Sequence, residues 1–459
     1  MTKRAAVEVP SFPQIGTVFD VGRLQLVSVI GTGGYGVVYR AIDTHELSNR
    51  SYAVKCLMRT EEHHQSHIRE IALHKLASSH PAIITLHRVV EEDAFLYIVM
   101  EYAPDQDLFV QILHKCRYLG NDSLIKSAFL QLLDALEHCH ALGIYHRDLK
   151  PENIVCFEDG VRLALTDFGL ATTQGTSGEF RTGSVYHMSP ECQTSEGTYE
   201  GIYSPQSCDI WSLGIVLLNI VTGRNPWKVA SHEDPTFRSF CRNPYYFLPK
   251  ILPISPELND VLVMMLSLEW RARPSISEIR SAVSQITTFY STAVVFEGNV
   301  ARCPWETGMD LGTGTQKANI SVDIPPQLPP RRPIAVKPRE SRALEDDDFF
   351  DHTFDDEILQ SELDDYPDEE QQLSYDTASS PTSRSDSSLC TSDSASPITP
   401  INADFSFDQH LASRPRSPFT SLISGLQCFF RLSSSDGSSH PENDKGRVSP
   451  DPEMFTIDL

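Results

Sequence analysis

Apolar and polar residues alternate through the first hundred residues in the manner of β-strands. From Leu24 apolar positions alternate with polar ones, a glycine-rich turn follows at 31–36, and the alternation continues through 52–57. This period of two predicts a hairpin with a glycine tip and then a third strand. Further elements expected in this part are a helix over 64–76 and strands at 83–91 and 95–100.

A helical period dominates the chain beyond residue 104. Apolar residues recur three and four positions apart over 122–142, and a strongly apolar stretch over 209–221 is too short to span a membrane. A strand-rich part followed by a helix-rich part predicts an α+β fold. The shorter elements expected here are a strand pair at 154–155 and 163–165 and helices at 261–268 and 276–286.

Neither end of the chain carries a periodic pattern. Residues 1–17 contain Pro10 and Pro13 and are predicted to be a flexible lead-in. From about residue 300 Ser, Asp and Pro dominate, so we expect a disordered acidic tail over 300–459.

The charge of the chain is strongly acidic and unevenly distributed. The formal net charge is -24, and residues 300–459 hold about 29 acidic against about 13 basic residues. A balance of this sign disfavours nonspecific binding to nucleic acid or to an anionic membrane. We therefore expect neither of these as a partner.

The cysteines and the N-terminal sequence indicate a compartment. The ten cysteines are scattered and form no Cys-x-x-Cys pair. The N-terminus lacks the apolar core of a secretory signal, and no apolar run reaches 18 residues. These features predict reduced thiols and a location in the cytoplasm, the nucleus or both.

The chemically most informative stretch is Tyr145-His146-Arg147-Asp148-Leu149-Lys150-Pro151-Glu152-Asn153. Asp148 is suited to accept a hydroxyl proton, Lys150 to steady the charge on phosphoryl oxygens, and Asn153 to hold a magnesium ion. The alternative is a polar turn after a helix. The four residues His, Arg, Asp and Asn at this spacing are expected by chance roughly 0.003 times in such a chain, which disfavours the alternative.

This stretch resembles the catalytic loop of eukaryotic protein kinases, and a lysine two places after the aspartate resembles their serine/threonine branch. The resemblance extends over about residues 24–290. It implies a bilobal fold with a β-rich N-lobe at about 18–100 and a helical C-lobe at about 104–290. It also implies transfer of the γ-phosphoryl group of ATP to Ser or Thr of protein substrates. The C-terminal half resembles fungal kinases of the type called negative regulator of sexual conjugation and meiosis.

The turn at Gly31, Gly33 and Gly36 has the spacing of a phosphate-covering loop. Glycine lets backbone N–H groups approach phosphate oxygens without side-chain interference. The spacing alone is weak, because it is expected by chance about 0.15 times in such a chain, and an ordinary hairpin is the alternative. A dinucleotide site would need a helix directly after the glycines, whereas a strand-like Val37-Val38-Tyr39 follows.

Lys55 lies in an otherwise apolar strand, where a lysine is costly to bury without a partner. We expect it to hold ATP phosphates and to pair with Glu70 from the helix over 64–76; a lysine leaning out of an edge strand is the alternative. We expect nearby histidines on a solvated face and no metal site among them. These are His63, His64, His67 and His74.

The kinase resemblance implies the remaining members of an ATP and magnesium site. Asp167, in Asp167-Phe168-Gly169, and Asn153 would hold Mg²⁺. Met100 would lie behind the adenine, and backbone groups of Glu101 and Ala103 would meet its edge. The implied ATP-binding residues are Gly31, Gly33, Gly36, Val38, Ala53, Lys55, Glu70, Met100, Glu101, Ala103 and Asp107.

Three supporting roles are also implied by the resemblance. Ser184 would contact the catalytic Asp and Lys through its hydroxyl. Glu191, in Ser189-Pro190-Glu191, would pair with Arg273, although the family usually has alanine where this chain has Ser189. Asp209 would accept hydrogen bonds from the backbone of the catalytic loop.

The segment between Asp167 and Glu191 departs from the family at the position that often carries an activating phosphothreonine. Phe180 occupies it and cannot be phosphorylated. Arg147 still needs an anion from this segment. The candidates are Glu179 or a phosphate on Thr176, Ser177 or Thr182. We expect that activity does not depend on a single phosphothreonine.

Substrate preference and the tail offer weaker signals. Asp107 and Glu152 are expected to favour a basic residue on the N-terminal side of the target, whereas Asn219 supplies no charge. Pro326-Gln327-Leu328-Pro329-Pro330-Arg331 fits a ligand of SH3 domains, with a stiff linker as the favoured alternative. Residues 345–370 interleave aromatic and aliphatic residues with carboxylates, which fits a docking segment or merely a solubilising one.

A scaffold is the rival to the enzyme. A pseudokinase would recruit partners through its acidic tail, but pseudokinases commonly lack the lysine, the catalytic aspartate or the magnesium-binding aspartate. This chain has all three, as Lys55, Asp148 and Asp167. The sequence therefore favours an active kinase.

Overall fold

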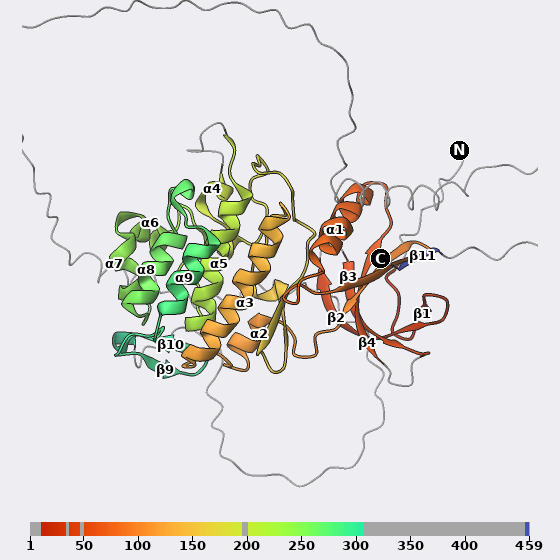
Figure 1. Ribbon diagram of the computed structural model, residues 1–459, viewed down its shortest axis with the longest axis horizontal. Coiled ribbons are helices and arrows are strands. Elements are labelled where there is room, and N and C mark those ends of the chain that lie inside the picture. Colours follow the sequence, from red (N-terminus) through yellow and green to blue (C-terminus); the bar gives the residue numbers. More distant parts are fainter. Residues whose placement is uncertain (1–10, 34–35, 46–49, 195–200, 307–454, 459) are drawn as a thin grey trace, which may run out of the picture.

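The computed structural model describes residues 11–33, 36–45, 50–194, 201–306 and 455–458. They form a sheet-rich lobe with one long helix, hereafter the N-lobe, and a larger helical lobe beside it, hereafter the C-lobe (Figure 1). This arrangement confirms the predicted α+β, two-lobed fold. No helix in the described ranges is long and apolar enough to cross a bilayer.

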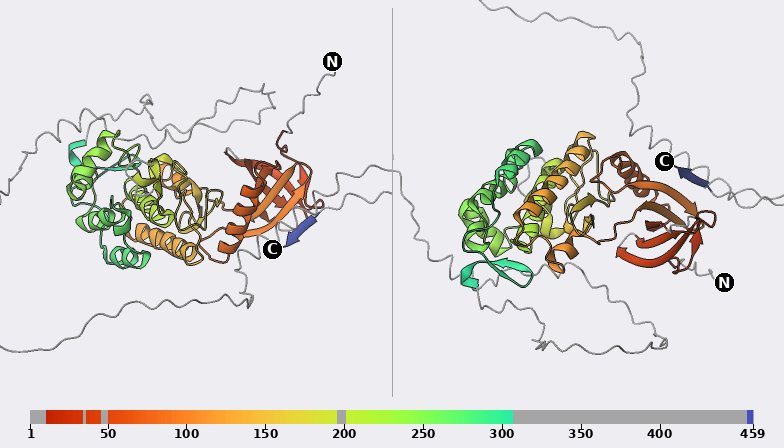
Figure 2. Two further views of the ribbon diagram at one scale, coloured as in Figure 1. Left: turned by 90° about the horizontal axis from the view of Figure 1, so that it is seen from above. Right: turned by 60° about the horizontal axis from the view of Figure 1, so that its bottom comes forward.

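The N-lobe is an antiparallel sheet in the order β1-β2-β3-β4-β6-β5-β11, with α1 packed beside it (Figure 2). Buried and less buried residues alternate along β3, as the period of two predicts. The elements are β1 Val18–Phe19, β2 Leu24–Gly33, β3 Gly36–Asp43, β4 Ser51–Met58, α1 His64–Ala77, β5 Leu86–Glu92, β6 Phe95–Glu101 and β11 Phe455–Asp458.

The C-lobe is organised around α5 (Pro205–Thr222), which is buried along nearly its whole length. Pro205 stands at its first turn, the side chain of Ser204 caps its N-terminus, and Gly223 ends it in the left-handed conformation. The other elements are α2 Leu108–Leu113, α3 Asp122–Ala141, η1 Pro151–Asn153, β7 Ile154–Phe157, β8 Arg162–Leu165, η2 Val185–His187, α4 Pro190–Gln193, α6 Pro235–Arg242, α7 Pro244–Ile251, α8 Pro256–Met265, η4 Trp270–Ala272, α9 Ile276–Gln285, β9 Val295–Glu297, β10 Val300–Arg302 and η5 Pro304–Glu306.

The predicted flexible lead-in is wrong for residues 11–17. The hydroxyl of Tyr39 donates to the carbonyl of Pro13 at 2.7 Å, and the ring of Phe12 lies 5.9 Å from that of Phe95. Burial of an aromatic side chain against the sheet stabilises this segment although it has no periodic pattern.

The boundary predicted at residue 290 is also wrong, because the C-lobe continues to residue 306. The strands β9 and β10 pair antiparallel, and Glu306 accepts a hydrogen bond from Arg224 at 2.8 Å, with both side chains buried. Of the predicted disordered tail, residues 300–306 belong to this lobe and β11 pairs antiparallel with β5. Arg224 and Glu306 are 82 positions apart, and the periodicity of neither segment reveals such a partner.

Candidate catalytic and nucleotide site

Lys55 links three elements of the site. From β4 its ammonium group lies 2.6 Å from a carboxylate oxygen of Glu70 on α1 and 2.9 Å from one of Asp167, which follows β8. Burial by itself would lower the pKa of Lys55, but the two carboxylates outweigh burial and raise it. The expected pairing of Lys55 with Glu70 is therefore present, and Asp167 joins it.

Three residues expected in the catalytic loop and beyond it converge on the carboxylate of Asp148. The hydroxyl of Ser184 donates to Oδ1 at 2.7 Å, and the amide of Asn153 donates to Oδ2 at 2.9 Å and to the backbone carbonyl at 2.8 Å. The ammonium of Lys150 lies 3.6 Å from Oδ2. The carboxylate is thus oriented on both oxygens and has a cation beside it.

Asp209 on α5 anchors the backbone of the catalytic loop. Its carboxylate is fully buried and accepts from the backbone N–H groups of His146 at 2.9 Å and Arg147 at 2.8 Å. The ring of His140 on α3 lies 2.9 Å from the same carboxylate, a contact that no local motif predicted. Arg147 has a φ of 66° and Asp167 a φ of 61°, so the backbone at both positions adopts the strained left-handed conformation.

Glu191 and Arg273 form the ion pair that their positions suggested. The guanidinium of Arg273 contacts the two carboxylate oxygens at 2.5 Å and 2.8 Å, and both side chains are buried. Arg273 also donates to the backbone carbonyls of Ser207 and Ser267. This pair ties α4 to the segment before α9 and so fixes the end of the segment that begins at Asp167.

The glycines of the β2–β3 hairpin differ in what requires them. Among the described residues, a Cβ on Gly33 would meet no atom within 4 Å, and one on Gly31 would meet only the side chain of Val38. A Cβ on Gly36 would overlap the backbone carbonyl of Cys56 on β4. Strand packing therefore requires Gly36, whereas open space beside Gly33 fits the approach of a ligand.

The residues expected around the adenine lie in one region of the N-lobe. Met100 belongs to an apolar cluster under the sheet, and Ala53 and Ala103 pack against that cluster. The backbone N–H of Glu101 donates to Thr85 at 2.9 Å, and its side chain pairs with Arg162 at 2.8 Å. The backbone N–H and the side chain of Glu101 are therefore both engaged within the protein.

Asp107 has a structural contact that the sequence did not indicate. Its carboxylate caps α2 by accepting from the backbone N–H of Val110 at 2.9 Å. Capping oxygens of this kind orient the following helix and remain able to accept a second hydrogen bond.

A column of rings joins α1 to the catalytic loop. The ring of His74 stacks on Phe168 at 4.9 Å, and Phe168 packs edge-on against His146 at 5.2 Å. The expectation of a solvated face is wrong for His67 and His74, which are buried. The position of His74 four residues after Glu70 placed it on the same helical face as that buried carboxylate and was a usable signal.

Buried histidines make the stability of the fold sensitive to acid. Burial lowers the pKa of His67, His74 and His187 to about 4, against an ordinary value of 6.5. Below pH 6.5 the unfolded chain therefore binds protons that the folded chain does not, so stability is complete above 6.5 and falls as the pH drops toward 4. We expect each histidine to contribute a loss of about 1–3 kcal/mol across this window.

Denaturant unfolding at pH 7 and pH 5 measures this loss as a lower midpoint at pH 5. The variant His74→Leu removes one of the three titrating groups and should show a smaller difference between the two pH values. An identical midpoint at both pH values would contradict the argument.

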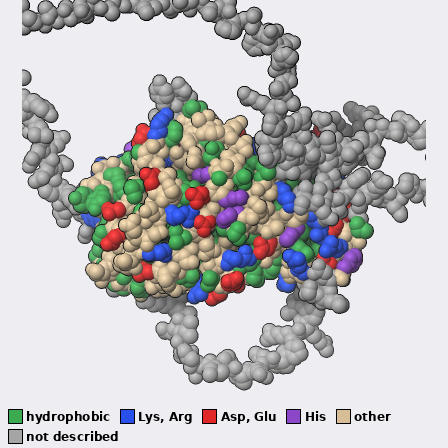
Figure 3. Space-filling model, viewed as in Figure 1, with side chains coloured by type: hydrophobic (Ala, Val, Ile, Leu, Met, Phe, Trp, Pro, Cys, Tyr) green, Lys and Arg blue, Asp and Glu red, His purple; other side chains and the backbone are tan. Residues whose placement is uncertain are grey.

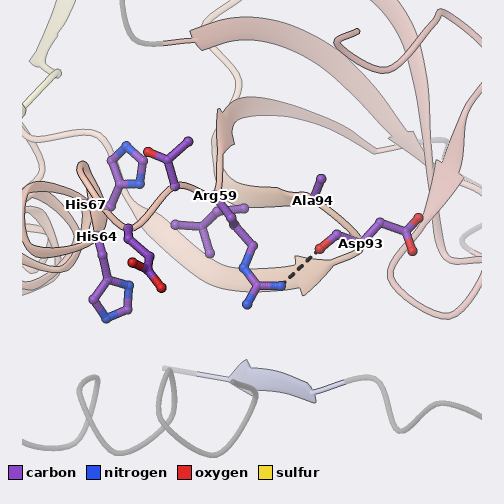
Figure 4. Close-up of a pocket in the computed structure, with 8 residues that line it drawn as sticks. Arg59, His64, His67, Asp93 and Ala94 are labelled. Atoms are coloured by element: carbon purple, nitrogen blue, oxygen red, sulfur yellow. Dashed lines mark hydrogen bonds between the residues drawn. The ribbon is translucent and has the colours of Figure 1, made fainter. Parts of the chain in front are cut away.

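A pocket of about 430 Å³ lies on the N-lobe, and the buried His67 is among the residues that line it (Figure 4). Arg59 crosses it and donates to the backbone carbonyl of Asp93 at 3.0 Å. On the face shown in Figure 3, side chains of both charge signs are interspersed over the described atoms. The pocket is lined by Arg59, Thr60, Glu61, His64, His67, Asp93, Ala94 and Leu96.

Comparison with known proteins decides the family. A family model described as the protein kinase domain matches residues 24–283. The chain belongs to the protein kinase family. Its kinase domain is 46% identical over 282 residues to the negative regulator of sexual conjugation and meiosis of Schizosaccharomyces pombe, covering 57% of this chain and 59% of that protein.

Two further relatives carry the words serine/threonine-protein kinase in their names. SKS1 of Saccharomyces cerevisiae is 34% identical over 338 residues, covering 59% of this chain and 66% of its own length. The ksp1 protein of Schizosaccharomyces pombe is 35% identical over 269 residues, covering 56% of each chain. This kinase chain therefore spans about three-fifths of the length of these relatives.

Proposed function

We propose that this chain is an ATP-dependent protein serine/threonine kinase. The observation that carries the proposal is the set of contacts around Asp148, whose carboxylate is oriented by Ser184 and Asn153 with Lys150 beside it. A fixed carboxylate of this kind can position a substrate hydroxyl and accept its proton. In this reading positioning and electrostatics supply most of the rate enhancement.

ATP fits the residues of the N-lobe. Open space beside Gly33 would admit the phosphates, and the ammonium of Lys55 would bind the α- and β-phosphates. The apolar surroundings of Met100 would receive the adenine. The carbonyl of Glu101 and the backbone of Ala103 would meet the adenine edge. Val38 and Ala53 would cover it, and Asp107 would contact the ribose.

Magnesium fits the oxygen donors of Asn153 and Asp167. The amide nitrogen of Asn153 donates a hydrogen bond to Asp148, so its side-chain carbonyl oxygen is the atom that would bind the metal. The side chain of Asp167 is 44% exposed. Hard cations prefer such oxygen ligands. A bound magnesium ion would neutralise phosphate charge, and the protein groups would hold the nucleotide and the hydroxyl in line.

A basic substrate residue is favoured by Glu152. Burial, together with the charges of Asp107 and Asp148, raises the pKa of Glu152 to about 7, and its Oε2 is buried with no hydrogen-bond partner in the described residues. The positive charge of a substrate arginine or lysine would favour the ionised form of Glu152 and would pair with it. Asn219 instead bonds to His187 and Asn225 and adds no charge.

The test is phosphorylation of a mixed peptide library by the full chain with ATP. We expect phosphate on Ser and Thr and several-fold enrichment of Arg or Lys on the N-terminal side. Glu152→Gln should reduce that enrichment, whereas the exposed Glu233→Gln should not. Absence of phosphoryl transfer would favour the scaffold over the kinase. Transfer without enrichment of basic residues would contradict the role of Glu152.

The relative from fission yeast is named for control of conjugation and meiosis, and we propose a role of this kind, in intracellular signalling in the cytoplasm or nucleus. The partners would be protein substrates, with no nucleic acid or membrane. The SH3 ligand at 326–331 and the docking segment at 345–370 lie outside the described residues and stay predictions.

A further inference from the structure

Arg147 is a buried cation whose anion comes from the segment after Asp167. Its side chain is only 4% exposed, its Nε donates to the carbonyl of Leu170 at 2.7 Å, and its Nη1 donates to Oε2 of Glu179 at 2.7 Å. A buried charge without a partner is strongly destabilising. Of the four anion sources that the sequence left open, the carboxylate of Glu179 makes the contact.

The backbone on either side of that carboxylate is held by hydrogen bonds to neighbouring side chains. The hydroxyls of Tyr203 and Thr182 donate to the carbonyl of Glu179 at 2.7 Å and 3.1 Å, and its N–H donates to the hydroxyl of Ser177 at 3.1 Å. Phe180 packs against a small apolar cluster in which Tyr203 lies 5.7 Å from its ring. Ser177 is itself buried. Two of the three candidate phosphorylation sites therefore already use their hydroxyls inside the segment.

A second arginine, in the N-lobe, adds a favourable charge to the same carboxylate. Arg69 lies on α1 next to Glu70, and its Nε is buried with no hydrogen-bond partner in the ranges that the structure describes. The hydrogen bond from Arg147, and the charges of Arg147 and Arg69, hold the pKa of Glu179 below its usual value. The carboxylate thus stays ionised beside the guanidinium of Arg147 on the catalytic loop.

We propose that Glu179 is a positioning residue whose permanent charge holds the catalytic loop and the segment after Asp167 in the active arrangement, so that this kinase needs no phosphate on that segment. The inference rests on the proposed kinase function and states how its site is regulated. Because the charge is part of the chain, the basal state is the active one. Control must then act elsewhere than through a phosphate in this segment.

The experiment uses the full chain treated with a protein phosphatase and shown by mass spectrometry to carry no phosphate. We expect it to retain at least about half the initial rate of the untreated chain. Glu179→Gln should lower kcat by about 10- to 100-fold, as misplacement of reacting groups does, with a smaller change in KM for ATP. Glu179→Asp should recover part of the loss, and the exposed Thr176→Ala should match the parent.

The two arginines give an internal check. Arg69→Gln should lower kcat, and the double variant Arg69→Gln/Glu179→Gln should lose less than the product of the two single losses, because Arg69 would act through the charge of Glu179. Loss of most activity on phosphatase treatment, or an unchanged kcat in a folded Glu179→Gln with an unchanged melting temperature, would overturn the inference. An untreated chain no more active than Asp148→Asn would instead overturn the proposed function.

Discussion

Replacing Asp148 with asparagine is expected to lower kcat by about 10²- to 10⁴-fold, the range typical of a lost general base. The amide has nearly the shape of the carboxylate and keeps an oxygen for the hydroxyl of Ser184, which now lies at 2.7 Å. It cannot take up a proton, and it presents an NH₂ group toward the amide of Asn153 or the ammonium of Lys150. The loss should therefore fall on the chemical step.

Steady-state kinetics measure this effect, with one peptide that the library experiment identifies as a substrate. KM for ATP should change far less than kcat, because no contact of Lys55 is altered. The matched control is Asp260→Asn, an exposed aspartate on α8, which should leave kcat within twofold. A kcat within tenfold of the parent for Asp148→Asn would remove Asp148 from the role of base.

Replacing Arg273 with methionine is expected to destabilise the C-lobe by about 3–5 kcal/mol. Methionine is apolar and of similar length, so the loss comes mainly from depriving the buried carboxylate of Glu191 of the two hydrogen bonds that Arg273 donates. The guanidinium also lies 4.9 Å over the ring of Trp211. A loss of this size should lower the melting temperature by about 10 °C.

Differential scanning calorimetry of both variants tests the argument. Arg271→Met is the matched control, because Arg271 pairs with Glu269 at 3.6 Å with both side chains more than half exposed. Exposed pairs contribute less than about 1 kcal/mol, so its melting temperature should stay within a few degrees of the parent. Equal effects of the two replacements would show that the buried pair adds no net stability.

The sequence alone determined the catalytic loop, because its members are close neighbours in the chain. Asp148, Lys150 and Asn153 lie within six positions, and one tight turn brings all three side chains together. Periodicity likewise predicted the two-part fold, since alternating and helical patterns follow directly from which faces are buried.

Only the tertiary structure decided how distant residues combine. Lys55 and Asp167 are separated by 112 positions, and their contact depends on how the fold brings β4 close to the segment that follows β8. The contact of Glu179 with Arg147 was equally out of reach of the sequence, because it depends on where Tyr203 and Arg147 hold the segment. Buried polar contacts of this kind require a partner from elsewhere in the chain, and no local pattern encodes that partner.

The same reason explains the predictions that failed. His74 looked like a surface residue by composition, yet its ring stacks on Phe168 from a segment almost a hundred positions away. Residues 11–17 and 291–306 carry no period, yet they are ordered by contacts with β3 and α5. Local sequence determines which backbone conformations and faces are favourable, whereas the exclusion of water between distant segments decides which side chains become partners.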